Sequence, residues 1–227
     1  MERKESLRRQ VIGLTTGETR ALIIIIVVFH LVGIIGFMIP ALYGLFVDLV
    51  PFHLVLMLAI VAGSHRPADG VFFLFAGIIF ILGFIVEWVG VHTELLFGHY
   101  YYGEALGLKL DNVPICIGVN WVLLIYSTGV CMKKTRVSNK YARIFTGALT
   151  LVLLDILIEP IAIKLNYWHW AFDIIPLKNY ICWFFVSAAF LFLYEQFHFK
   201  KQSIVAPVFL LVQFLFFIIL RLGFLWF

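Results

Sequence analysis

Apolar residues run along this 227-residue chain in long blocks that short polar segments separate. Breakers and charges mark seven blocks, at 21–39, 44–63, 71–91, 113–132, 144–164, 179–197 and 204–225. An apolar helix of about 20 residues crosses the hydrocarbon core of a bilayer. The pattern therefore predicts an all-α, polytopic membrane bundle of about seven transmembrane helices, with a kink at Pro51 in the second helix.

The composition excludes a soluble globular protein. The chain is 63% apolar and only 13% charged, whereas soluble domains carry about 25% charged residues. Lipid must therefore solvate much of its surface. Because seven spans use most of the chain, residues 1–227 are expected to form a single transmembrane domain.

Basic residues gather on one side of the predicted bundle. With the N-terminus inside, 13 of the 17 lysine and arginine residues fall on the cytoplasmic face. These are Arg3, Lys4, Arg8, Arg9, Arg20, Arg66, Lys133, Lys134, Arg136, Lys140, Arg143, Lys200 and Lys201, while Lys109, Lys164, Lys178 and Arg221 fall opposite. Cytoplasmic loops carry such an excess, so we expect a multi-pass protein of the cell (inner) membrane with a cytoplasmic N-terminus and an external C-terminus. Membrane lipid, and not nucleic acid, is then the expected partner of this basic chain.

Four polar side chains interrupt the apolar blocks at one depth, in the half of the bundle opposite the basic face. They are Glu87, Asn120, Asp155 and Glu159. Ionisable groups inside a membrane are costly unless they pair or face a cavity, so these residues are candidates for a functional site. Asp155 and Glu159 are four residues apart and share one helix face. Pro160 is expected to free the carbonyl group of Ile156 for a water molecule near both acids.

The two outer connections, 92–112 and 165–178, are the longest in the chain and are rich in tyrosine, tryptophan and histidine. We expect them to form a mouth or lid over the acids. Glu94 would share a face with Glu87 if the third helix continued into the first connection. In the alternative interpretation, Trp168 and Trp170 are interfacial anchors, as tryptophan is in many membrane proteins.

Several enzyme classes lack their residues in this chain. The histidines are scattered and no aspartates stand three or four apart, which excludes di-iron oxygenases and magnesium-dependent prenyltransferases. Nucleotide-binding and serine-hydrolase motifs are absent from the sequence. Cys116, Cys131 and Cys182 form no CxxC or Cys/His cluster, and the pairing of Cys116 with Cys182 is left open. We expect neither a metal nor an organic cofactor.

Carboxyl groups, amides and aromatic rings in an apolar cavity suit acid chemistry on a lipid. A carboxyl group removed from water favours its neutral form and can act as a general acid. Protonation of a trisubstituted alkene gives a tertiary carbocation, which aromatic faces stabilise and water can capture. The same residues would serve a cyclase or an isomerase, in which the cation loses a proton instead.

Two segments resemble the integral-membrane carotenoid 1',2'-hydratase family, whose members act on γ-carotene or bisanhydrobacterioruberin. The first comprises Glu87-Trp88-Val89-Gly90-Val91-His92-Thr93, Phe97-Gly98-His99-Tyr100-Tyr101-Tyr102, Leu106-Gly107, Val113-Pro114 and Asn120-Trp121. The second comprises Asp155-Ile156-Leu157-Ile158-Glu159-Pro160, Trp168-His169-Trp170, Ile175-Pro176 and Asn179 to Trp183. Two glycines that the resemblance leads us to expect are replaced, since Thr93-Glu94 stands for Thr-Gly and Asn166 stands at or near the second glycine.

The resemblance implies hydration of the 1',2' double bond of an acyclic (ψ) carotenoid end group to a tertiary 1'-hydroxyl, with lycopene, γ-carotene or a similar carotenoid as substrate. We predict that the deepest acid, Asp155, donates the proton, and that Glu159 and Glu87 orient water or stabilise the cation. The predicted substrate-binding residues are Trp88, His92, Tyr100, Tyr102, Asn120, Trp121, Trp168, Trp170, Asn179 and Trp183, of which the two asparagines hold the water.

Two other interpretations stay open. One is a carotenoid end-group cyclase or isomerase that uses the same acid. The other is a membrane transporter or carotenoid-binding protein, which is less favoured because the inner half of the bundle is nearly bare of the polar groups that alternating access needs. Other enzymes of the carotenoid pathway are expected partners in each enzymatic case.

Overall fold

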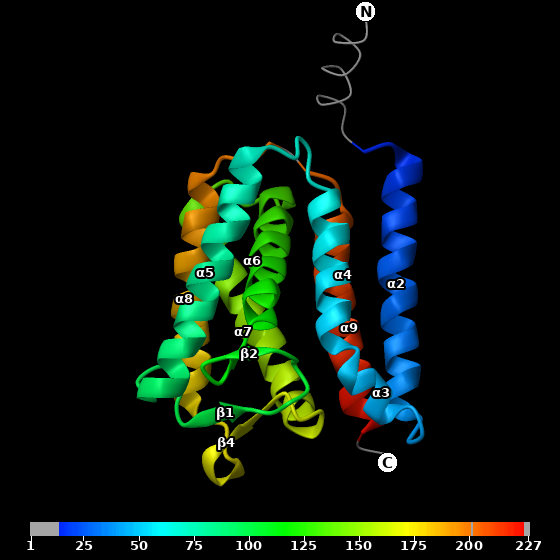
Figure 1. Cartoon of the computed structure of the whole chain (residues 1–227). Helices are drawn as coiled ribbons and strands as arrows, with labels where there is room; N and C mark the ends of the chain where they lie inside the picture. Colours follow the sequence, from blue (N-terminus) through cyan, green and yellow to red (C-terminus); the bar gives the residue numbers. More distant parts are fainter. Residues whose placement is uncertain (1–13, 201, 225–227) are drawn as a thin grey trace, which may run out of the picture.

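The computed structural model describes residues 14–200 and 202–224, and helices make up most of them. Six of the described helices are long and apolar enough to cross a membrane. They are α2 (Thr16–Met38), α5 (Gly70–Thr93), α6 (Cys116–Lys134), α7 (Lys140–Lys164), α8 (Leu177–Gln196) and α9 (Val205–Gly223). Figure 1 shows them as a bundle of roughly aligned helices, which confirms the predicted all-α membrane fold.

The second predicted span is divided at Leu49, two residues before Pro51, where a kink was predicted, although Leu49 keeps helical backbone angles. It forms a short helix α3 (Tyr43–Asp48) and a 14-residue helix α4 (Val50–Gly63), which meet at Leu49. Pro51 lies in the first turn of α4, where its missing N–H group costs no helical hydrogen bond. At 1.5 Å per residue α4 is only about 21 Å long, so it is shorter than the hydrocarbon core, which is about 30 Å thick.

Helix α6 occupies the centre of the bundle. It packs against α4, α5, α7, α8 and α9. In its membrane-spanning stretch 78% of the residues are buried, compared with 22% in that of α2. Its mean hydropathy of 1.3 is nevertheless the lowest of the six long helices. A central helix faces protein on every side, so it can carry the polar groups that a lipid-facing helix cannot.

The basic residues separate between the two ends of the bundle. Arg66, Lys133, Lys134, Arg136, Lys140 and Lys200 lie where α4, α6 and α8 end and where α5, α7 and α9 begin, at the end where α2 begins (Figure 1). Lys109, Lys164, Lys178 and Arg221 lie at the opposite end. The basic residues are therefore divided between the two ends as predicted, and which end faces the cytoplasm stays a prediction. The predicted contributions of Arg3, Lys4, Arg8, Arg9 and Lys201, and of the C-terminus, lie outside the described residues.

Two small sheets cap the end of the bundle opposite the basic loops (Figure 1). Strand β1 (Tyr100–Tyr102) pairs antiparallel with β4 (Trp168–Trp170), and β2 (Lys109–Leu110) pairs with β3 (Val113–Pro114). A 3-10 turn, η1 (Ala171–Asp173), follows β4. The two long connections are therefore joined through β1 and β4 into one cap over α5, α6 and α7.

Candidate active site

A small chamber of about 30 Å³ lies beneath the β1–β4 sheet. This volume has room for a water molecule. Most of the polar and aromatic residues singled out in the sequence line it. Its walls are formed by Glu87, Phe97, Tyr100, Tyr102, Ile117, Asn120, Ile158, Glu159, Trp168, Trp170, Asn179 and Trp183.

The carboxylate of Glu87, on α5, accepts three hydrogen bonds. The hydroxyl groups of Tyr100 and Tyr102 each donate to its Oε2 at 2.7 Å, and the indole N–H of Trp121 donates to its Oε1 at 3.0 Å. Gly83 lies one turn earlier on the same helix, where a Cβ atom would be 2.7 Å from Trp121. The missing side chain of Gly83 thus lets Trp121 approach α5 closely enough to reach the acid.

Glu159, on α7, also accepts three hydrogen bonds. The indole N–H groups of Trp168 and Trp170 donate to its Oε2 at 3.0 and 2.7 Å, and the Asn179 amide donates to its Oε1 at 3.0 Å. The two tryptophans therefore bind an acid in the bundle, which a purely interfacial anchoring role does not require.

The β1–β4 register explains why these four donors converge. Tyr100 pairs with Trp170 and Tyr102 pairs with Trp168, so all four side chains point to the same face of the sheet. The intervening pair, Tyr101 and His169, points away from the chamber, with ring centroids 5.3 Å apart. One short sheet thus supplies donors to two acids, with β1 serving Glu87 and β4 serving Glu159.

Burial keeps the two inward tyrosines protonated. The pKa values of Tyr100 and Tyr102 lie well above the ordinary tyrosine value, first because the rings are removed from water and second because the charge of Glu87 is close. Both phenols therefore remain hydrogen-bond donors at any physiological pH.

Asp155 is the least hydrogen-bonded of the three acids. Its Oδ2 accepts one hydrogen bond from the Asn179 amide at 2.9 Å. Its Oδ1 is buried and has no partner among the described residues. Asp155 is 0% exposed and lies behind the chamber wall, whereas Asn179, which bridges it to Glu159, lines the chamber.

Trp88 and His92 do not line the chamber. Trp88 is 39% exposed and donates its indole N–H to Asp111 at 2.7 Å, while its ring stacks on His92. His92 lies 3.3 Å from the same carboxylate. The Trp88 hydrogen bond lowers the pKa of Asp111 below its ordinary value. These three residues form an exposed group outside the site.

Two local expectations were wrong. Helix α5 ends at Thr93, so the Glu94 carboxylate lies at the surface, 3.3 Å from His99, and does not share a face with Glu87. The carbonyl of Ile156 is not free for water, because the Arg221 guanidinium of α9 donates a hydrogen bond to it at 3.3 Å. Pro160 removes one hydrogen bond inside α7, and a neighbouring helix replaces it.

The three cysteines are free thiols. The Cys116 thiol donates a hydrogen bond to the carbonyl of Leu106 at 3.0 Å, so the pairing of Cys116 with Cys182 that the sequence left open is not found. Among the residues that the structure describes, no group of three or more His, Cys, Asp and Glu side chains could hold a metal ion.

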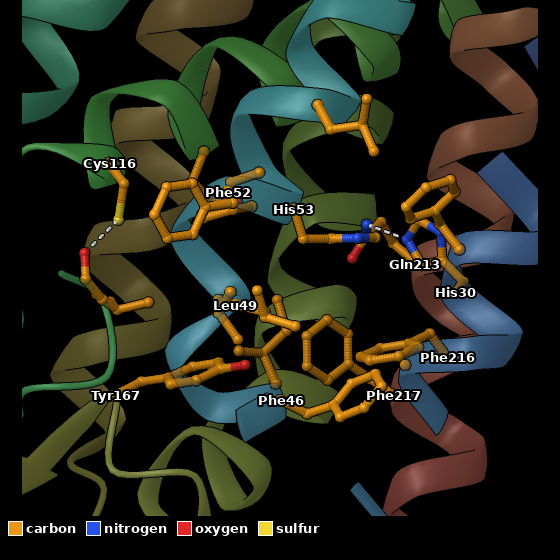
Figure 2. Close-up of a pocket in the computed structure, with 18 of the residues that line it drawn as sticks. His30, Phe46, Leu49, Phe52, His53, Cys116, Tyr167, Gln213, Phe216 and Phe217 are labelled. Carbon is orange, nitrogen blue, oxygen red and sulfur yellow. Dashed lines mark hydrogen bonds between the residues drawn. The ribbon is translucent and has the colours of Figure 1, made fainter. Parts of the chain in front are cut away.

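A much larger cavity, of about 300 Å³, adjoins the chamber, and the sequence did not reveal it. Its walls come mainly from α2, α3, α4, α6 and α9, with contributions from α7 and from the cap, and are mostly apolar (Figure 2). The cavity and the chamber share four wall residues, Ile117, Asn120, Ile158 and Trp168. Sequence patterns could not predict the cavity, because it is lined by ordinary apolar residues from helices that are distant in the chain.

The fold and the site define an integral membrane protein that holds buried carboxyl groups beside an apolar cavity. The chain matches the carotenoid biosynthesis protein family over residues 50–226 and belongs to that family. No curated protein and no solved structure matches it. The family gives the protein a role in carotenoid biosynthesis, with a carotenoid as its substrate.

The two replaced glycines stand at left-handed backbone positions. Glu94, which caps α5, has φ 55°, and Asn166, in the connection before β4, has φ 57°. Glycine occupies this region without the steric cost that a Cβ atom adds, and asparagine tolerates it better than most residues. Both departures therefore keep the backbone turn that a glycine would make.

Proposed function

We propose that this protein is a carotenoid hydratase that adds water across the 1',2' double bond of an acyclic ψ end group. The observation that carries the proposal is a polar chamber that adjoins an apolar cavity: Glu87 and Glu159 line the chamber, and Asp155 lies behind its wall. A hydrocarbon chain fits the cavity, and a reaction that consumes a proton and a water fits the chamber.

The polyene would lie in the apolar cavity with its terminal double bond at the shared wall. Asn120 stands at this wall and has no hydrogen-bond partner among the described residues. Its amide is therefore available to hold the attacking water. Trp183 stacks on Trp121 with ring centroids 4.6 Å apart, which fixes the aromatic wall on the side of α8.

The pair of acids on α7 would supply the proton. Glu87 and Glu159 each accept three hydrogen bonds, as ionised carboxylates do, whereas Asp155 accepts one and leaves Oδ1 unpaired. We assign the resting proton to Asp155. Glu159, which shares the Asn179 amide with Asp155 and lines the chamber, would present the proton to the alkene.

The proposed reaction balances without a cofactor. A proton adds to C2' of the alkene and leaves a tertiary cation at C1', and the oxygen of water then bonds to C1'. The water gives up one proton to the pair of acids, which restores them. The carboxylate of Glu87 and the faces of Trp168, Trp170 and Tyr100 would stabilise the cation while it exists.

The experiment is expression in cells that accumulate lycopene or γ-carotene, followed by mass analysis for one added water. Asp155→Asn, Glu159→Gln and Glu87→Gln should each lose most of the hydroxylated product. Tyr101→Phe, which changes a residue of β1 that points away from the chamber, is the matched control. Unchanged product from all three acid variants would end the proposal of acid chemistry.

Growth in water labelled with oxygen-18 separates the hydratase from a cyclase or an isomerase, because only hydration leaves the labelled oxygen in the product. A transporter or a carotenoid-binding protein would yield no new carotenoid at all. We also propose that the protein works in the cell (inner) membrane with its N-terminus in the cytoplasm, close to the other enzymes of the pathway.

A further inference from the structure

A second polar group interrupts the apolar cavity away from the acid chamber. It consists of His30 on α2, His53 on α4 and Gln213 on α9, which line the same cavity. Figure 2 shows His30 and Gln213 across the cavity from Cys116 and Tyr167. Polar side chains within a membrane bundle are costly unless they have partners, so this cluster needs an explanation that the chamber does not supply.

Hydrogen bonds inside the cluster orient Gln213. The Nδ1 of His30 lies 2.7 Å from the carbonyl oxygen of Ile26, so this nitrogen carries the proton. The Nε2 of His30 is then an acceptor, and the Gln213 amide donates to it at 2.9 Å. This arrangement fixes which way the amide of Gln213 points, and His30 is thereby fully bonded.

Several polar atoms of the cluster remain without protein partners. Among the described residues, no side chain or backbone group hydrogen bonds to the Gln213 carbonyl oxygen or to the His53 ring. The His53 ring packs edge-on against His30, with centroids 4.7 Å apart. Gln213 and His53 together thus offer a donor and acceptors to whatever occupies the cavity.

We propose that Gln213 and His53 form a subsite that binds a hydroxyl group on the apolar ligand whose double bond reaches the acid chamber. A hydroxyl group both donates and accepts one hydrogen bond, which matches the unpaired atoms of the two side chains. A pure hydrocarbon would leave them unpaired. The inference rests on the proposed function for the orientation of the ligand, and it adds that an isoprenoid bearing a hydroxyl group binds more tightly than the corresponding hydrocarbon.

Short polyprenols provide the probe, because they end in the same trisubstituted alkene at one end and in a hydroxyl group at the other. Farnesol and geranylgeraniol would each be mixed in equal amounts with the hydrocarbon in which hydrogen replaces the hydroxyl. The full-length protein in detergent is equilibrated with each pair and re-isolated, and the bound lipids are extracted and quantified by gas chromatography. Two chain lengths report how far the cluster lies from the chamber.

The wild-type protein should retain the alcohol over the hydrocarbon by about fivefold for at least one chain length, the factor that one hydrogen bond supplies. Gln213→Met and His53→Phe preserve the size of the side chain and should bring this ratio close to one without reducing bound hydrocarbon. Gln196→Met is the matched control, because Gln196 is an exposed glutamine at the end of α8 whose amide donates, among the described residues, to the Phe192 carbonyl alone.

Equal retention of alcohol and hydrocarbon by the wild-type protein at both lengths, or an unchanged preference in both variants, would overturn the subsite. The proposed hydration is scored separately. If the hydration proposal is wrong, the alcohol preference persists while no hydrated carotenoid forms. If the subsite proposal is wrong, hydrated carotenoid forms but the protein shows no preference for the alcohol. Asp155→Asn should abolish the product and keep the preference.

Discussion

Replacement of Asn179 by leucine should destabilise the protein severely. The Asn179 amide donates to Asp155 at 2.9 Å and to Glu159 at 3.0 Å, and all three side chains are buried. With the proton on Asp155, the bond to the ionised Glu159 contributes about 1.5–3 kcal/mol and the bond to the neutral Asp155 about 0.5–1.5 kcal/mol, so the loss of both amounts to roughly 2–4.5 kcal/mol. Leucine has a similar volume, so the loss is of hydrogen bonds and not of packing.

Thermal unfolding in detergent measures this loss. In a chain of this length each kcal/mol lowers the midpoint by about 2–4 °C, so Asn179→Leu should unfold at least about 4 °C below the wild type. Asn120→Leu is the matched control. It removes an amide that has no hydrogen-bond partner among the described residues, so it should shift the midpoint by no more than about 2 °C.

Asn120→Leu should affect the reaction rather than the stability of the fold. Asn120→Leu should lower hydrated product by about tenfold or more in a stable protein, because the water loses its partner. A midpoint for Asn179→Leu that equals that of Asn120→Leu would refute the reasoning, since it would mean that the amide bridge between the two acids contributes nothing to the folded state.

Three further outcomes are expected. Tyr102→Phe removes one 2.7 Å donor from buried Glu87 and should lower stability by about 1.5–3 kcal/mol, whereas Tyr101→Phe, on the outward face of the sheet, should leave the melting midpoint unchanged. Glu94→Gly should raise stability by up to about 1 kcal/mol, because φ is 55° there; a lower midpoint would contradict this. Burial lowers the pKa of His65, in the loop after α4, to about 4, whereas the pKa of a histidine in the unfolded chain is about 6.5. Acidification from pH 7 to 5 should therefore favour unfolding, and His65→Phe should unfold with a shallower dependence on pH; equal slopes would argue against this role.

Much of the architecture could be predicted from the sequence because lipid imposes a strong constraint on it. Apolar blocks of membrane-spanning length have few alternatives to a helix. The segment 44–63 differs only in detail: the interruption lies at Leu49 and not at Pro51, because Pro51 fits the first turn of the second helix.

The acid chamber was also partly predictable. Helical rise placed Glu87, Asn120 and Glu159 at one depth, and all three line the chamber. Grouping residues by their nearness in the chain ignored the direction of their side chains. Trp88 follows Glu87 in the chain and was grouped with it, yet a one-residue step turns a helical side chain by about 100°, which takes Trp88 to the exposed surface.

The pairing of β1 with β4 was beyond sequence reasoning. Each strand is three residues long, too short for an alternating pattern to stand out among many aromatic residues. The cavity and its cluster of His30, His53 and Gln213 were missed for a related reason. These residues come from three helices, and an isolated polar residue within an apolar block carries no sign of its partners.

The sequence positions of the donors to the two acids bear on how the chain enters the membrane during synthesis. Glu87 is bonded by residues 100, 102 and 121, and Glu159 by residues 168, 170 and 179. Every one of these donors follows its acid in the chain, and none comes from an earlier segment. Each carboxyl group thus acquires its partners from the residues that leave the ribosome next. The carboxylate on each helix can therefore be hydrogen bonded as soon as the following connection and helix have been synthesised. The two halves of the site can form one after the other.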